Sequence, residues 1–82
     1  MAAFNGSCLI RRAGLNSDDG RVNLDLKAVS GAFDWTWFLA KQQHNREILA
    51  IALAAIASNK NVYVQTNATT SWTEVSYFDI EK

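Results

Sequence analysis

A continuous apolar run over residues 48–57 is the feature that most constrains the fold of this chain. It lies in a longer stretch of strong helix formers that begins at Arg46. The asparagine-containing segment 58–61 ends this stretch, because asparagine tolerates the left-handed conformation that closes many helices. The sequence therefore predicts one helix over about 45–58, with Asn45 as its N-cap.

The side chains of this run form two faces around the helix axis. The larger ones share a wide arc, which we expect to pack on a sheet: Ile48, Leu49, Ile51, Leu53 and Ile56. The other face is made of alanines: Ala50, Ala54 and Ala57. A helix that is apolar all round must be covered on two sides, and a chain of this size supplies one sheet. We therefore expect a second copy of the chain to cover the alanines and a flank of Ile51 and Leu53, in a ring or a dimer.

Before the helix, alternation of apolar and polar residues indicates strands. The segment 22–28 is the clearest one, because every second residue is apolar. A strand over 6–12 precedes it, and the turn formers of 16–20, which end in Gly20, predict a hairpin between the two.

A third strand is expected over 33–39, and it is rich in aromatic residues. One face of this strand should lie in the core, because large rings supply much of the apolar area that a small fold can bury. The residues of that face are Phe33, Trp35, Trp37 and Leu39. This assignment leaves Phe38 on the opposite face, exposed or at an interface.

After the helix, we expect a short strand over 62–66, a polar loop over 67–71 and a last strand over 72–80. The apolar residues of the last strand change face near Ser76, which predicts a bulge there or burial on both faces. The order β-β-β-α-β-β predicts a single, mainly β domain over 1–82 with one helix. This is the element order of the OB-fold, so we expect a small OB-like Greek-key barrel.

The second half of the chain, about residues 46–80, resembles the B-subunits of five-subunit bacterial enterotoxins. The similarity lies in a helix followed by the strand Val62-Tyr-Val-Gln-Thr66, a polar loop and a closing strand that ends Ser76-Tyr-Phe-Asp-Ile80. In that family the subunits close into a ring and bind sugars on one face. The resemblance implies an OB-fold, self-association and glycan binding. This chain has one cysteine where that family has a pair, its helix is uncharged along the apolar run, and no sugar-binding residue of the family can be matched onto it.

Charge and composition argue against two classes of partner. Eight basic and eight acidic residues give a formal net charge of zero, whereas general nucleic-acid binders need an excess of lysine and arginine. The apolar run is shorter than the roughly 20 residues that span a bilayer. The first residues lack the charged and apolar regions of a signal peptide, so we expect a cytoplasmic protein without a membrane span.

The candidate reactive residues do not form a catalytic or metal-binding pattern. His44, the one histidine, is expected in a solvated loop rather than in the cleft that a general base needs. Cys8, the one cysteine, is expected to be a buried and inert thiol of the first strand. Asp18 and Asp19 are expected to be turn residues, because the spaced ligands of a calcium loop do not follow them. We expect no enzyme, no metal and no cofactor.

Binding is the function that these observations favour. We expect an oligomeric binding or scaffold module for a glycan or another neutral ligand, because an indole packs against sugar rings and nearby polar side chains can hydrogen-bond to them. The candidate ligand-binding residues are Trp72, Asn67, Thr70 and Phe38. Two alternatives are open: binding of single-stranded nucleic acid on the face of strands 22–28 and 33–39, and a structural contact with another protein.

Overall fold

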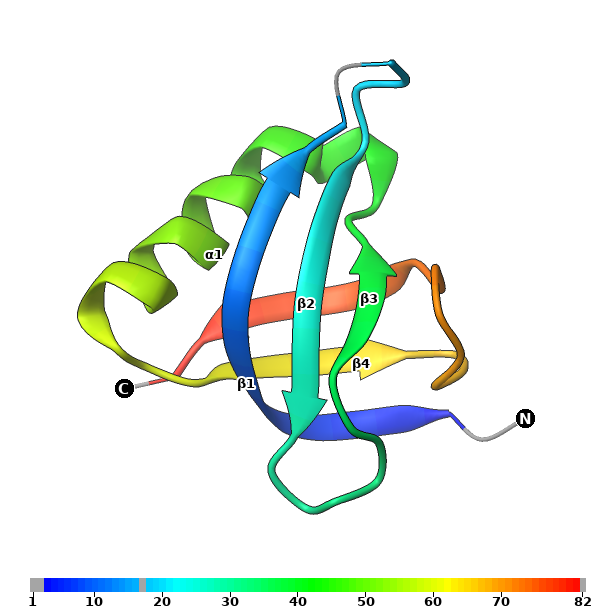
Figure 1. Ribbon diagram of the computed structural model, residues 1–82, viewed down its shortest axis with the longest axis vertical. Helices are drawn as coiled ribbons and strands as arrows, with labels where there is room; N and C mark the ends of the chain where they lie inside the picture. Colours follow the sequence, from blue (N-terminus) through cyan, green and yellow to red (C-terminus); the bar gives the residue numbers. More distant parts are fainter. Residues whose placement is uncertain (1–2, 17, 82) are drawn as a thin grey trace.

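The computed structural model describes residues 3–16 and 18–81, and it consists of one sheet and one long helix (Figure 1). The mainly β architecture and the predicted order of elements are both confirmed. The strands are β1 (Phe4–Leu15), β2 (Val22–Ala28), β3 (Thr36–Leu39), β4 (Val62–Thr66) and β5 (Val75–Ile80). A 3-10 turn, η1 (Gln42–His44), leads into the helix α1 (Asn45–Ser58).

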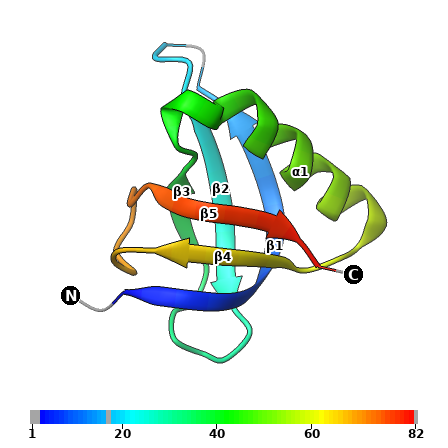
Figure 2. The ribbon, with the colours of Figure 1, turned by 180° about the vertical axis from the view of Figure 1, so that it is seen from behind.

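The five strands form one antiparallel sheet in the order β3-β2-β1-β4-β5. Strand β1 is long and bends strongly, so that it belongs to two layers (Figure 1). Its first part pairs with β4, from Phe4 opposite Thr66 to Cys8 opposite Val62. From Cys8 onward it pairs with β2. Viewed from behind, β4 and β5 cross the direction of β2 at a steep angle (Figure 2).

The sheet is not closed into a full barrel. Within the described residues, its two edge strands meet at a single parallel bridge between Leu39 and Glu74. Two backbone hydrogen bonds strengthen this contact: the Leu39 amide donates to the Thr73 carbonyl at 3.0 Å, and the Trp72 amide donates to the Trp37 carbonyl at 2.7 Å. The edges of β3 and β5 therefore touch at one corner.

The helix covers one side of the sheet (Figure 2). Its buried face is narrower than the apolar face that we predicted. Its buried residues are Ile48, Ala52 and Ala55. Its outward face consists of small or apolar residues, which we call the α1 strip: Ala50, Leu53, Ala54 and Ala57. Ile51 is half-buried between the two faces and packs against the core. The three alanines thus lie on the outer side, as expected, whereas Leu53 joins them there.

The predicted orientation of the third strand is wrong. Phe38 is fully buried, while Trp35 and Trp37 are half-buried on the outer face of the sheet. The pairing with β2 explains this reversal, because Phe38 lies opposite Leu24, whose side chain points into the core. Inside the core, the ring of Phe38 packs at 5.1 Å from that of Phe33. Phe38 is therefore a core residue, and the expectation of an exposed ring at this position does not hold.

Asn45 has a different role from the predicted N-cap. It is the first residue of α1, and the capping position before it, His44, makes no side-chain cap. The Asn45 side chain accepts a hydrogen bond from the Val22 amide at 3.0 Å and donates to the Gly20 carbonyl. It therefore ties the start of the helix to the β1–β2 turn, where Gly20 has the positive φ of 71° that favours glycine.

Two other local predictions are confirmed. Asn59 ends α1 in the left-handed conformation, with φ 56° and ψ 46°. The bulge near Ser76 is also present: Thr66 pairs with Val75 and Gln65 pairs with Tyr77, which leaves Ser76 as the extra residue. Its hydroxyl donates to the Gln65 carbonyl at 3.0 Å, so the bulge is fastened to the neighbouring strand.

Candidate ligand-binding site

A second bulge, in β1, places two consecutive arginines on the outer face of the sheet. Ile10 pairs with Leu26 and Arg12 pairs with Asp25, so Arg11 is the extra residue between them. Regular alternation would send neighbouring side chains to opposite faces. The bulge instead directs both arginines toward Asp25 on β2.

Asp25 is a buried carboxylate held by both guanidinium groups. Arg11 Nε donates to Asp25 Oδ2 at 2.7 Å. Arg12 donates to the same oxygen from Nη2 at 3.1 Å and from Nε at 3.3 Å. The Asp25 residue is 1% exposed, whereas the arginine side chains keep about half of their surface in solvent. Asp25 alternates with the inward-facing apolar residues of β2 and so lies on the outer face of the sheet, but the side chains above it exclude water.

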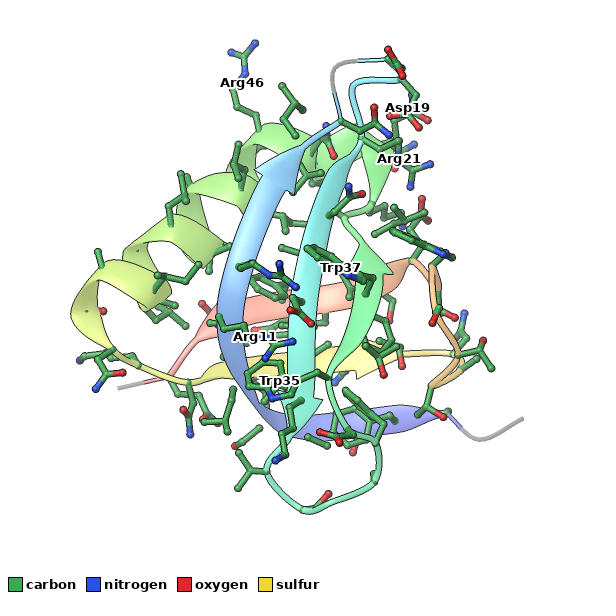
Figure 3. The ribbon with its side chains drawn as sticks, viewed as in Figure 1. Arg11, Asp19, Arg21, Trp35, Trp37 and Arg46 are labelled. Atoms are coloured by element: carbon green, nitrogen blue, oxygen red, sulfur yellow. The ribbon has the colours of Figure 1, made fainter. Side chains whose placement is uncertain are left out.

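Each arginine also lies over a tryptophan ring, and Figure 3 shows Arg11 beside Trp35 on this face. The guanidinium carbon of Arg11 is 4.3 Å from the centroid of the Trp35 ring, and that of Arg12 is 4.9 Å from the centroid of Trp37. Both distances are within the range of cation–π contacts. We call the surface made by Arg11, Arg12, Asp25, Trp35 and Trp37 the arginine–tryptophan face.

Trp72 extends this face from the loop between β4 and β5. Its ring is nearly parallel to that of Trp37, with an interplanar angle of 10° and a centroid distance of 6.3 Å. Trp72 is 55% exposed, and its backbone has a φ of 70°. A positive φ is strained for a bulky residue and is found mostly where the surroundings impose it. Here the bond from its amide to the Trp37 carbonyl contributes to that constraint.

The polar loop that carries Trp72 is partly organised by hydroxyl groups on both sides of this residue. Thr73 Oγ1 donates to the Thr70 carbonyl at 2.8 Å and lies 3.2 Å from Thr70 Oγ1. Asn67 and Thr70 are exposed, while Ala68 between them is buried. Three of the four predicted ligand-binding residues thus belong to one exposed loop, and the fourth, Phe38, lies in the core.

The face carries an excess of positive charge, because two arginines meet one buried carboxylate. At its margin, Lys27 Nζ lies 3.8 Å from Asp34 Oδ1; the Asp34 side chain is largely exposed, and that of Lys27 is partly exposed. The sequence did not reveal the role of the two arginines, and we predicted Trp35 and Trp37 in the core, whereas both lie on the outer face. One feature of the sequence indicates the bulge. The core-facing apolar residues of β1 lie at even positions up to Ile10, as Cys8 does, and at an odd position afterwards, at Ala13. Such a change of face is typical of a bulge.

The other candidate residues lie away from this face. His44 is exposed at the start of α1. Cys8 is buried, as predicted, and burial raises the pKa of its thiol to about 12, with a smaller contribution from the negative charge of Glu81. An open hollow of about 530 Å³ lies between the end of β1 and the start of α1, where Leu15, Gln42 and Arg46 contribute to its lining. It shares no residue with the arginine–tryptophan face.

Over residues 3–16 and 18–81, no group of three or more His, Cys, Asp or Glu side chains is arranged to hold a metal ion. In the same part of the chain, no helix has the length and apolar character needed to cross a membrane. Comparison with protein-family models, curated proteins and solved structures finds no match to this chain.

Proposed function

We propose that the protein is a non-enzymatic binding module, and that it recognises a glycan or a similar ring-shaped ligand at Trp72 and the arginine–tryptophan face. The observation that carries this proposal is the conformation of Trp72, a large ring that is 55% exposed and held at a positive φ. Strained residues cluster at ligand-binding positions. An indole supplies a flat apolar surface that matches the C–H face of a sugar ring.

The surroundings of Trp72 supply the polar contacts that such a ligand needs. Ligand sites combine aromatic surfaces with a few placed hydrogen-bonding groups. The Asn67 amide and the Thr70 hydroxyl are exposed on the loop that leads to Trp72. On the other side of Trp72, the parallel ring of Trp37 fixes its orientation. A ring-shaped ligand would therefore meet a positioned indole rather than a freely rotating one, which lowers the entropy lost on binding.

A glycan array followed by tryptophan-fluorescence titration tests this function. We expect saturable binding of at least one glycan, with Trp72→Ala weakening it by about tenfold or more, since stacking on an aromatic ring contributes on the order of 1 kcal/mol or more. Tyr77→Ala is the matched control, because Tyr77 is another exposed ring, on β5, and contacts Tyr63 rather than Trp72. Absence of any response to sugars at millimolar concentration, or equal losses in both variants, would refute the proposal.

Single-stranded nucleic acid is a second candidate ligand of the same face. The observation that favours it is the pair of arginines stacked on Trp35 and Trp37, since bases stack on aromatic rings and on guanidinium planes. The zero net charge of the chain argues against a long polyphosphate partner. Titration with oligothymidylate in about 50 mM salt tests it. Binding that weakens steeply as salt rises would favour nucleic acid over a glycan.

Self-association through the α1 strip is the second part of the proposed function. Leu53 is 50% exposed and is flanked by exposed alanines over about two turns of α1. Alanines allow another helix or strand to approach closely, and a continuous apolar strip of this length is uncommon on a monomer. A second copy of the chain is the proposed occupant, in a closed ring or a two-fold dimer. Co-purification of a different protein on this strip would instead favour the structural-partner alternative.

A further inference from the structure

The arginine pair has more positive charge than its buried partner requires. One guanidinium would be enough to balance the single carboxylate of Asp25, yet the bulge in β1 brings two. Both arginine side chains remain about half exposed. The surplus charge therefore lies at the surface rather than being neutralised inside the protein. Arg12 lies over Trp37, the ring on which Trp72 stacks.

The hydrogen-bonding capacity of the pair is also only partly used. Asp25 accepts from Nε of Arg11 and from Nε and Nη2 of Arg12. The other guanidinium N–H groups of both residues have no acceptor among the described residues, although each guanidinium carries several donors in one plane. These groups can donate to an additional acceptor supplied by a ligand.

The geometry points to an oxyanion site formed by Arg11 and Arg12, and we propose that the ligand of the arginine–tryptophan face is an acidic sugar. Its carboxylate or sulfate would accept from the unused guanidinium N–H groups while its ring stacks on Trp72. This inference rests on the proposed function and specifies the class of ligand. Planar guanidinium groups match the paired oxygens of carboxylate and sulfate better than an ammonium does.

The site is positioned before any ligand arrives. Asp25 holds one edge of each guanidinium group. One flat face of each group also packs on an indole, that of Arg11 on Trp35 and that of Arg12 on Trp37. An arginine on an unsupported surface would lose much of its side-chain freedom on binding an anion, whereas these two have already lost it on folding. This preorganisation distinguishes the pair from Arg46, which projects from the start of α1 away from the face (Figure 3).

Titration at constant ionic strength with three small probes tests this inference: sodium glucuronate, methyl glucoside and sodium sulfate. The readouts are the Nε–Hε signals of Arg11 and Arg12 in nuclear magnetic resonance spectra and the tryptophan fluorescence. We expect glucuronate and sulfate to shift both arginine signals saturably, and glucuronate to bind at least about tenfold more tightly than methyl glucoside, because loss of one charge-assisted bond has an effect of that size.

Variants separate the oxyanion site from general electrostatics. Arg12→Gln should weaken glucuronate by about tenfold while Arg11 continues to pair with Asp25, so that the fold is retained. Arg12→Lys should also weaken it, because the charge remains but the planar donors are lost. Arg46→Gln removes the same charge elsewhere and should leave all three affinities unchanged.

The possible results distinguish this inference from the proposed function. If methyl glucoside binds as tightly as glucuronate and Arg12→Gln has no effect, the oxyanion site is refuted while the ring-binding function stands. If sulfate and glucuronate bind equally and Trp72→Ala affects neither, the oxyanion site stands and the ring-binding function is refuted. If no probe moves either arginine signal, or if oligothymidylate alone does, the acidic-sugar inference is refuted.

Discussion

Replacing Asp25 by asparagine should be among the most destabilising single polar substitutions on the sheet. The change keeps the shape of the side chain but removes its negative charge. The carboxylate oxygen Oδ2 accepts all three hydrogen bonds from Arg11 and Arg12. Breaking a fully buried ion pair costs about 3–5 kcal/mol. The arginines are about half exposed, so water can solvate them in the variant and the loss must be smaller. We expect the free energy of unfolding to fall by about 2 kcal/mol.

Denaturation in urea, followed by tryptophan fluorescence, measures this loss. For a domain of this size, a change of about 2 kcal/mol corresponds to a melting temperature lower by roughly 10 °C. Asp34→Asn is the matched control, because the Asp34 side chain is 84% exposed and its partner Lys27 is 3.8 Å away. That substitution should change the free energy of unfolding by less than about 0.5 kcal/mol.

A double variant decides whether the carboxylate acts through the arginines. If it does, Asp25→Asn combined with Arg12→Gln should cost about 1 kcal/mol less than the sum of the two single changes, because both remove the same contact. Additive losses would show that Asp25 stabilises the fold by other means. A loss for Asp25→Asn as small as that for Asp34→Asn would refute the ion-pair argument altogether.

Three further predictions concern other parts of the molecule. Ala54→Glu should reduce the particle size measured by light scattering, because a charge in the proposed contact of the α1 strip would be buried without a partner; a wild-type particle of 9.1 kDa would refute that contact. Burial and, to a lesser extent, Glu81 raise the pKa of Cys8 from 9.0 to about 12, so the unfolded chain releases this proton at lower pH than the folded one and stability falls as pH rises above 9. Between pH 9 and 10, denaturation should show about 1 kcal/mol less loss in Cys8→Ala than in the wild type; equal losses would contradict the shifted pKa. Trp72→Gly should keep the free energy of unfolding within about 1 kcal/mol, since relief of the positive φ offsets the lost stacking on Trp37, yet abolish sugar binding; a larger loss would make Trp72 a structural residue.

The elements that sequence reasoning located correctly are those whose pattern has one interpretation. The alternation in β2 fixes which residues point inward, and the uninterrupted apolar run fixes the helix. At Ser76 the change of face in the last strand allowed a bulge or burial on both faces, and the structure has the bulge. In each case a local pattern and the tertiary structure agree.

The pattern of the third strand was ambiguous, because large aromatic residues occupy both of its faces. Its orientation was decided by pairing with β2, which places Phe38 beside Leu24 and Trp37 beside Asp25. The ligand-binding face was missed for a related reason. The face can be found from the sequence only if the bulge at Arg11 is recognised. The residues after the bulge, such as Ala13, are small and bury little apolar surface, so the change of face in the sequence is weak.

The bend of β1 has a consequence for the order in which this protein folds. Its second part pairs with β2, the next strand in the chain, so this ladder can form early from a short loop. Its first part pairs with β4, as in the pairing of Phe4 with Thr66. This ladder forms later, because it requires closure of the long loop between the two strands. Cys8, which pairs with both Ala28 and Val62, is the residue at which the two ladders meet, and we expect them to open as separate units. Hydrogen exchange on the native protein should therefore find slower opening of the amides after Cys8 than of those before it.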